Sequence, residues 1–189
     1  MSFYTQDELK RLGFRKLGKN VKISNKTSIY GAERICIQDH SRIDDFCVLS
    51  AGEGGIDIGR YVHIAVYSSL IGQAEIILRD FAGLSSRVSI YSSTDDYSGE
   101  TLTNPTIPAA YLKIISKKVI LEKHVIVGAG TIILPGCHLK EGAAVGAQSL
   151  VTKDCEAFTI YAGVPARRIN TRSRKLLDAE KKLLGESHE

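Results

Sequence analysis

The chain of 189 residues is 43% hydrophobic and 24% charged, which is the composition of one globular domain. Its net charge of +4 is too small to indicate a nucleic-acid partner. No apolar run reaches the ~18 residues of a membrane span and no leader pattern opens the chain, so no membrane partner is expected and the cytoplasm is the predicted location. The four cysteines lack C-x-x-C spacing, and we expect reduced, buried, structural thiols.

The first predicted element is a short helix within residues 1–16. Thr5 and Glu8 have the spacing of a capping box, which satisfies two of the free backbone N–H groups at a helix start. Leu9 and Leu12 then share one face, and Gly13 is typical of a helix stop.

A period of six residues begins at Leu17 and runs to residue 155. Each block opens with an aliphatic residue, and a small or β-branched residue follows four positions later, most regularly from Leu121 to Thr152. This repeat is the signature of a hexapeptide β-helix, in which each block is a short strand plus a corner and coils must stack to bury their aliphatic side. Six triangular coils result, opening at Leu17, Ile37, Ile58, Leu78, Leu121 and Leu139.

The period is interrupted four times, always after the third block of a coil. The steps from Ile29, Leu49 and Leu70 to the next block are eight or nine residues, and the step from Ile90 is thirty-one. All insertions therefore leave the helix at one corner. The last is a long arm, residues 92–116, whose length in so regular a scaffold indicates a functional segment.

The remaining segment, residues 156–189, is predicted to be a tail followed by a closing helix. Five basic residues without an intervening acid precede the helix, and Ser173 is its expected cap. The leucines of the helix lie on one side: Leu176, Leu177, Leu183 and Leu184.

These blocks, the extruded arm and the terminal string AGVPARRI resemble the hexapeptide-repeat acyltransferases over nearly the whole chain. The resemblance implies an all-β, left-handed parallel β-helix, a homotrimer, and an active site between subunits with coenzyme A as donor. The handedness comes from the resemblance alone, since the usual crossover rule predicts the opposite hand.

The strings FYTQDELKRLGF, RIDDFCVLS and DFAGLSSR, with DDYSG in the arm, resemble more narrowly the nucleotide-sugar N-acyltransferases that act on 4-amino-4,6-dideoxyglucose. This resemblance implies transfer of an acyl group from acetyl-CoA, or another acyl-CoA, to the amino group of a dTDP-linked sugar. It also implies a place in polysaccharide biosynthesis and no metal cofactor.

The arm departs from the wider family at Asp95. Members that acylate hydroxyl groups carry a catalytic His where this chain has Ser92-Ser93-Thr94-Asp95. A hydroxyl needs strong help from a base, whereas an unprotonated amine is already a nucleophile, so the loss of the imidazole favours an amine acceptor. Asp95 is the predicted catalytic residue that orients or deprotonates the amine; the alternative is a turn held by an Asx bond.

Ser85 is the second predicted catalytic residue, because the resemblance places it beside the reacting centre, where it would hydrogen-bond the sugar or the oxyanion. The alternative is an ordinary surface serine. The residues predicted to bind the acceptor are His63, Ser86, Asp96 and Tyr97. His124 and His138 are expected to face solvent in columns different from that of His63, so no three-histidine zinc site is expected.

The predicted coenzyme A contacts lie in the last coils and the tail. The small residues Gly128, Ala129, Gly146 and Ala147 would leave room for the pantetheine arm, and Arg167 and Arg168 would meet its phosphates. A solubilising basic face is the alternative for the arginines. Two rival functions stay open at this point: O-acetylation of a sugar or antibiotic hydroxyl, and a non-catalytic hexapeptide scaffold.

Overall fold

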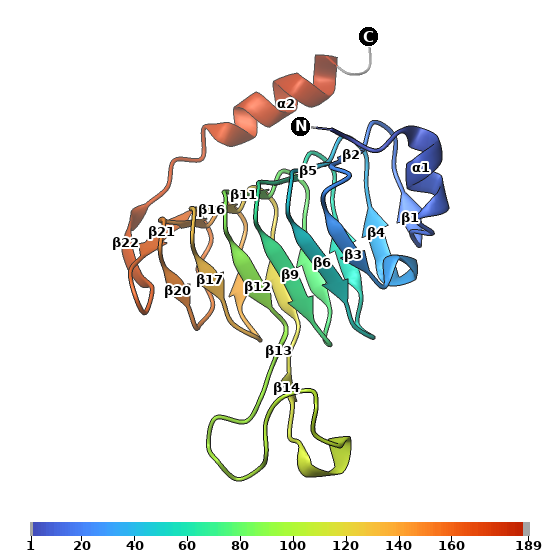
Figure 1. Cartoon of the computed structure of the whole chain (residues 1–189). Coiled ribbons are helices and arrows are strands. Elements are labelled where there is room, and N and C mark those ends of the chain that lie inside the picture. The colour runs from blue at the N-terminus through green and yellow to red at the C-terminus, as the bar shows by residue number, and fades with distance from the viewer. Residues whose placement is uncertain (1, 187–189) are drawn as a thin grey trace.

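The computed structural model describes residues 2–186, which form a triangular parallel β-helix with an arm and two terminal helices (Figure 1). Its three faces are parallel sheets in which each strand pairs with the equivalent strand of the coils before and after it. The arrangement is that of a left-handed β-helix.

The strands of the three sheets, in stacking order, have the following bounds. The first sheet holds β1 (Lys16–Leu17), β4 (Ile35–Ile37), β7 (Ile56–Ile58), β10 (Ile76–Leu78), β15 (Val119–Leu121) and β18 (His138–Leu139). The second holds β2 (Lys22–Ile23), β5 (Arg42–Ile43), β8 (His63–Ile64), β11 (Gly83–Leu84), β16 (Ile126–Val127), β19 (Ala144–Val145), β21 (Thr159–Ala162) and β22 (Arg167–Thr171). The third holds β3 (Ser28–Tyr30), β6 (Val48–Ala51), β9 (Ser69–Gly72), β12 (Ser89–Tyr91), β17 (Ile132–Ile133) and β20 (Leu150–Val151).

The core is a ladder of the predicted inward residues. Every block opener from Ile37 onward is buried, as are the small residues four positions later, so the period of six is confirmed. Where the small inward residue carries a hydroxyl, that hydroxyl hydrogen-bonds to a carbonyl of the next coil. Ser41 Oγ donates to the Gly59 carbonyl at 2.6 Å, and Thr131 Oγ1 donates to that of Gly146 at 3.0 Å. A small polar residue therefore costs the core no unpaired group.

The six predicted coils are confirmed, and the stack continues into part of a seventh. Leu139 bridges Cys155, and β21 pairs in parallel with β19 through Ala144–Ile160 and Val145–Tyr161. Strand β22 then folds back antiparallel on β21 and ends the second sheet. Because Thr159–Ala162 falls outside the period of six, the sequence pattern did not reveal this turn.

Two corners of the prism are built from non-glycine residues with positive φ, a conformation that few side chains adopt readily. At the corner between the first and second sheets, the rings of His40, Tyr61, Phe81 and His124 stack coil upon coil with centroids 4.8–5.1 Å apart. We call these four residues the aromatic column. Ring stacking between adjacent coils helps to offset the backbone strain at each corner.

The third corner carries all the insertions, as predicted. The first bulge contains η1 (Ala32–Arg34), and the Arg34 guanidinium donates to the carbonyls of Ala51 and Gly52 in the next bulge. The root of the arm rests on the bulge before it, since Ser92 N donates to Ile71 O at 3.0 Å and Gln73 N to Ser93 Oγ at 3.2 Å.

The arm projects from this corner as a separate lobe (Figure 1). Its stem is an antiparallel pair, β13 (Ser93–Thr94) with β14 (Ile115–Ser116), and its far end contains η2 (Ala109–Tyr111). Its side chains include exposed apolar groups: Tyr97, Leu102, Tyr111, Ile114 and Ile115.

Helix α1 (Gln6–Arg11) has the predicted capping box between Thr5 and Glu8, and Leu9 is fully buried. Helix α2 (Leu176–Glu186) leans back over the corner that carries the aromatic column (Figure 1). Glu180 of α2 is ion-paired with Lys123 and lies 2.8 Å from His124 Nε2. His124 is therefore shielded from solvent, because α2 covers the corner at which it lies. Across residues 2–186, no helix is long and apolar enough to cross a membrane.

Candidate active site

Three predicted residues, Ser85, Ser86 and His63, line one hollow of about 290 Å³ on the outer face of the second sheet. Gly83 makes this hollow: it occupies the outward position between His63 of the previous coil and Ile126 of the next, and a Cβ there would meet open space. Ala65, Leu84 and Ile126 complete the lining. The hollow is therefore apolar at its walls, with two hydroxyls and one imidazole.

His63 is held from below by a residue that the sequence pattern did not reveal. Its Nε2 lies 2.9 Å from Asp44 Oδ2, and the Asp44 side chain is 7% exposed against 52% for His63. Arg42 Nε donates to the other carboxylate oxygen, Oδ1, at 2.7 Å. The sequence does contain Asp44, in the string RIDDF, one coil before His63. The two residues become neighbours only through the register in which β5 and β8 stack.

Asp95 and Tyr97 line a second hollow, of about 410 Å³, at the root of the arm. Its other walls are Tyr91, Ser93, Thr94, Leu134 and Pro135, which come from the third face and the corner with the bulges. Asp95 is half-buried and Tyr97 is 91% exposed. Within one subunit, therefore, Asp95 and Ser85 lie in different hollows on different faces.

Asp96 has a structural role in the arm, and its predicted contact with the acceptor stays a prediction. Its Oδ1 accepts from Ser98 N and Oγ at 2.9 and 2.7 Å, and its Oδ2 accepts from Thr101 N and Oγ1, both at 3.2 Å. The hydrogen bonds from Ser98 and Thr101 lower the pKa of Asp96 to about 2. The Asx turn considered for Asp95 is thus made by Asp96, which is buried and shapes the arm.

The small residues of the last coils have a structural reason that differs from the predicted one. A Cβ at Gly128 would lie 2.4 Å from Ala147 N, and one at Gly146 would lie 2.9 Å from Ala162 Cβ. The missing side chains would point at the next coil, so close packing of the coils also favours glycine here, and contact of Gly128 and Gly146 with coenzyme A stays a prediction. Their N–H groups are also used, by Val145 O and Tyr161 O. Contact with coenzyme A through Ala129 and Ala147 stays a prediction.

The basic tail divides into two parts. Arg167 and Arg168 are exposed on β22 and line a hollow of about 170 Å³ with Lys153 and Tyr161. Arg172, in contrast, donates from Nη1 to His124 O at 2.7 Å and to Gly142 O at 3.0 Å, and burial lowers its pKa. Arg174 stacks on Phe158 at 4.1 Å. Arg172 and Arg174 therefore fasten the tail to the stack.

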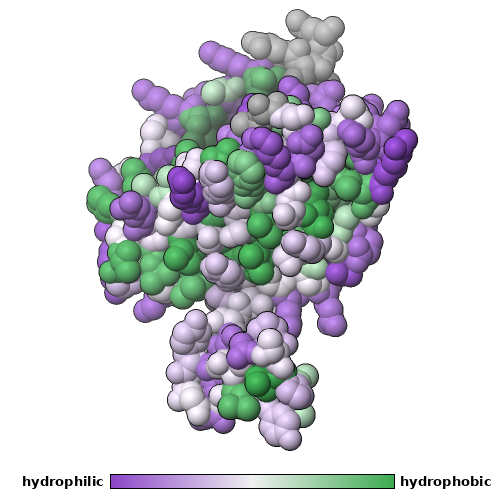
Figure 2. Space-filling view, viewed as in Figure 1, coloured by the Kyte–Doolittle hydropathy of each residue, from purple (hydrophilic) through white to green (hydrophobic). Residues whose placement is uncertain are grey.

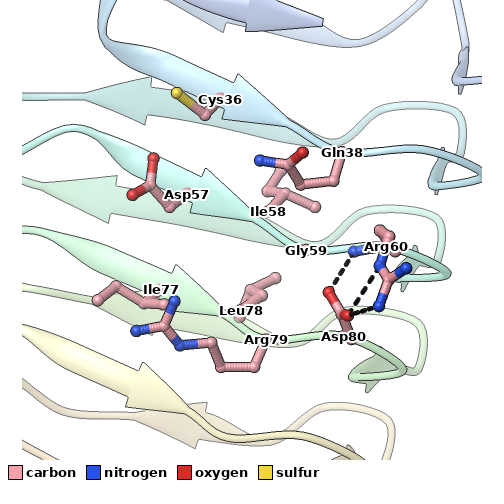
Figure 3. Close-up of a pocket in the computed structure, with 10 residues that line it drawn as sticks. All are labelled: Cys36, Gln38, Asp57, Ile58, Gly59, Arg60, Ile77, Leu78, Arg79 and Asp80. Carbon is pink, nitrogen blue, oxygen red and sulfur yellow. Dashed lines mark hydrogen bonds and ion pairs between the residues drawn. The ribbon is translucent and has the colours of Figure 1, made fainter. Parts of the chain in front are cut away.

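A further hollow, of about 280 Å³, lies on the first face between β4, β7 and β10 (Figure 3). Two of its acidic groups are paired: Arg60 Nε and Nη2 donate to Asp80 Oδ2 at 3.0 and 2.8 Å, and Arg15 reaches Asp57 Oδ1 at 2.7 Å from two coils below. The pairing with Asp80 raises the pKa of Arg60. These contacts join different coils, and we assign this hollow to the stacking of the first face.

Neither metal nor thiol chemistry is indicated in the described residues. No group of three or more His, Cys, Asp or Glu side chains in residues 2–186 is arranged to hold a metal ion. The cysteines are free, and burial raises the pKa of Cys47 and Cys137 to about 11 and that of Cys155 to about 12. Those three thiols therefore stay protonated and unreactive near neutral pH. Cys36 is half-buried.

Comparison with known proteins gives near full-length matches. The chain is 54% identical over 180 residues to the dTDP-4-amino-4,6-dideoxy-D-glucose acyltransferase of Escherichia coli, which covers 95% of this chain and 94% of the relative. No family model matches the chain. Weaker matches include the galactoside O-acetyltransferase of Lactococcus lactis, 38% identical over 44% of the chain and 43% of the relative.

Among solved structures, AntD, an N-acyltransferase from Bacillus cereus in complex with dTDP and 3-hydroxybutyryl-CoA, superposes with a TM-score of 0.94. It is 46% identical, and the match covers 100% of this chain and 99% of AntD. Variants of AntD with a substituted aspartate or serine superpose equally well. A maltose O-acetyltransferase from Clostridium difficile shares the fold, with a TM-score of 0.60 and 19% identity over 90% of this chain and 80% of its own.

Proposed function

Because this chain belongs to the family of dTDP-4-amino-4,6-dideoxy-D-glucose acyltransferases, we propose that it transfers an acyl group from acyl-CoA to the 4-amino group of that nucleotide sugar. The observation that carries this conclusion is the 54% identity to the Escherichia coli enzyme, which extends over 95% of the chain. It agrees with the identity to AntD, whose structures contain dTDP or the aminosugar nucleotide together with coenzyme A. The chain is therefore an enzyme with acyl-CoA as cosubstrate, and an amine rather than a hydroxyl is its acceptor.

The reaction joins the amine nitrogen to the thioester carbonyl carbon and releases the CoA thiol. Ser85 would donate a hydrogen bond to the sugar or to the oxyanion that forms on the carbonyl, and Asp95 would accept one from the amine. Supporting this assignment, the serine and the aspartate substituted in the AntD structures lie ten positions apart, as Ser85 and Asp95 do here. Ser86 and Tyr97 line the same two hollows and would contact the acceptor.

We also propose a homotrimer with its active sites between subunits. Ser85 and Asp95 lie in separate hollows of one subunit, so a single acceptor meets both only if the arm of one subunit reaches the second face of another. The outer faces carry apolar groups suited to an interface: Tyr67, Ile126 and Ile132 are 40–50% exposed, and Figure 2 shows apolar side chains spread over the face of the third sheet.

The donor would lie along the last coils toward β22. The exposed Arg167 and Arg168, beside Lys153, offer cationic groups to the phosphates of coenzyme A. The alanines Ala129 and Ala147, next to the tightly packed glycines Gly128 and Gly146, would border the pantetheine arm. The cytoplasm and a place in polysaccharide biosynthesis stay predictions.

The direct test is thiol release from acetyl-CoA and from 3-hydroxybutyryl-CoA with dTDP-4-amino-4,6-dideoxyglucose as acceptor. The matched control is the dTDP-6-deoxyglucose that carries a hydroxyl in place of the amine. We expect release with the amine and none above background with the hydroxyl. Equal release with both acceptors, or none with the amine for either donor, would overturn the proposal. Light scattering that gives a monomer at micromolar concentration would contradict the trimer.

A further inference from the structure

The hollow that holds Ser85 is also lined by His63, whose imidazole is paired with a carboxylate behind it, and this pair has no part in the function proposed so far. His63 lies at the wall of the hollow, and its Nε2 is 2.9 Å from Asp44 Oδ2. Of the residues that line the hollow in the described part of the chain, His63 is the one whose side chain can act as a proton acceptor or donor.

Asp44 is fixed from several directions. Its carboxylate is 7% exposed and accepts from Arg42 Nε at Oδ1, which leaves Oδ2 directed at His63. Its backbone is anchored as well, since Asp44 N donates to Ile64 O at 2.9 Å and Asp44 O accepts from Thr27 Oγ1 at 3.1 Å. A charged, immobile carboxylate of this kind determines which imidazole nitrogen carries the proton.

The pair therefore sets the chemistry of His63. With Asp44 ionised, Nε2 carries the hydrogen and donates it to Oδ2, so the lone pair lies on Nδ1. The same carboxylate stabilises the imidazolium once Nδ1 takes a proton. The cation of Arg42 opposes that charge from β5, where its Nε donates to Asp44, and Ile126 and Gly83 on the other side bring no charge.

We propose that His63, positioned by Asp44, is the proton acceptor in the acylation, which rests on the proposed function. The neutral amine attacks the thioester carbon, the C–N bond forms and the C–S bond breaks. One amine hydrogen moves to His63 Nδ1, and the imidazolium then returns that proton to the departing CoA thiolate, giving the free thiol. Asp95 in this scheme orients the amine, and the proton acceptor lies on the coil face instead of the arm.

The chain offers a matched control. His138 Nε2 lies 3.0 Å from Glu122 Oε1, so it is also an imidazole paired with a carboxylate from the preceding coil, but it lies on the first face, outside the hollow. His63→Asn and His138→Asn make the same chemical change. Asn also keeps an acceptor atom near the position of Nδ1, so His63→Asn preserves a hydrogen bond while removing proton affinity.

The experiment measures kcat/KM for the aminosugar nucleotide against pH, with saturating acyl-CoA. In the parent enzyme both the amine and His63 must be unprotonated, so log kcat/KM should rise with a slope of two at low pH. His63→Asn should lower kcat by about 100-fold, the low end for a general base, and reduce that slope to one. Its Kd for the nucleotide sugar should change less than threefold, and His138→Asn should keep both the rate and the slope.

Asp44→Asn tests the positioning role. We expect kcat to fall about tenfold and the imidazole limb to move to lower pH, while the double variant with His63→Asn is no slower than His63→Asn alone. A His63→Asn enzyme that keeps the slope of two, or a kcat within threefold of the parent, would overturn the inference. These outcomes are distinct from failure of the proposed function, which would show as an inactive parent enzyme.

Discussion

The coil stack and the arm follow opposite rules. In the stack every position repeats, so the place of a residue in its block determines its burial. Lys22, for example, is exposed, and its neighbour Ile23 is fully buried. In the arm no position repeats, and its shape comes from individual contacts such as those of Asp96 with Ser98 and Thr101. The comparison teaches that the inward positions of the repeat carry stability, whereas its outward positions and the arm are free to carry chemistry.

The largest expected effect is on stability and tests the stack. Ile23→Ala should lower the free energy of unfolding by about 2–5 kcal/mol, because it leaves a cavity in a fully buried ladder. Lys22→Ala, one position earlier on the same strand, should change it by less than about 0.5 kcal/mol. Denaturant unfolding of the two variants measures the difference, and equal losses would contradict the alternation.

The next prediction concerns the arm. Asp95→Asn keeps the shape of the side chain but removes its charge, and we expect kcat to fall by about 100-fold, because misplacing the attacking amine costs a factor of that order. Asp95→His should not restore full activity, since the imidazole is bulkier. Steady-state kinetics decide the matter, and a kcat/KM within threefold of the parent would show that the carboxylate is not required.

A smaller effect is expected in the tail. Arg167→Ala with Arg168→Ala should raise the KM for acyl-CoA about tenfold with little change in kcat, because contacts to distant phosphates bind the ground and transition states alike. The control is Arg174→Ala, which also removes a cation from the tail, but one that is stacked on Phe158. We expect it to leave the KM for acyl-CoA nearly unchanged. If the double variant weakens the nucleotide sugar instead, the donor and acceptor ends have been exchanged.

The smallest effect is a pH dependence of the arm. Hydrogen bonds from Ser98 and Thr101 lower the pKa of Asp96 to about 2, below the unfolded value of about 3.9. The stability that the ionised Asp96 gives to the arm is therefore fully present above about pH 4 and is lost as the pH falls through about 2. Amide hydrogen exchange at Ser98 and Thr101 should be slow at pH 4 and accelerate, beyond the intrinsic trend, toward pH 2. In Asp96→Asn this extra acceleration should be absent.

The sequence predicts the stack almost completely, because burial of one side chain in every block imposes a period that survives in the residues themselves. The same holds for the capping box of Thr5 and Glu8, which is a local pattern. What could not be predicted depends on contacts between distant segments. The burial of His124 requires α2, which arrives fifty-six residues later at Glu180.

The candidate site divides in the same way. Ser85, Ser86 and His63 could be placed on one face from their block positions, and the structure brings them into one hollow. Asp44 was missed because its partner is nineteen residues away and one coil above it. For Gly128 and Gly146 the residue type alone could not separate two reasons, since close packing of coils and clearance for a ligand both favour glycine.

The pairing of each coil only with its immediate neighbours has a consequence for biogenesis. Coils that emerge early from the ribosome already have their capping helix α1 and can stack on one another before the last residues are made. The nascent chain therefore grows as a column whose newest edge is always an unpaired coil, open to aggregation, until β22 folds back on β21 and α2 settles against His124. The tail covers the last coil, so a chain truncated before residue 172 would end in an unpaired, open coil.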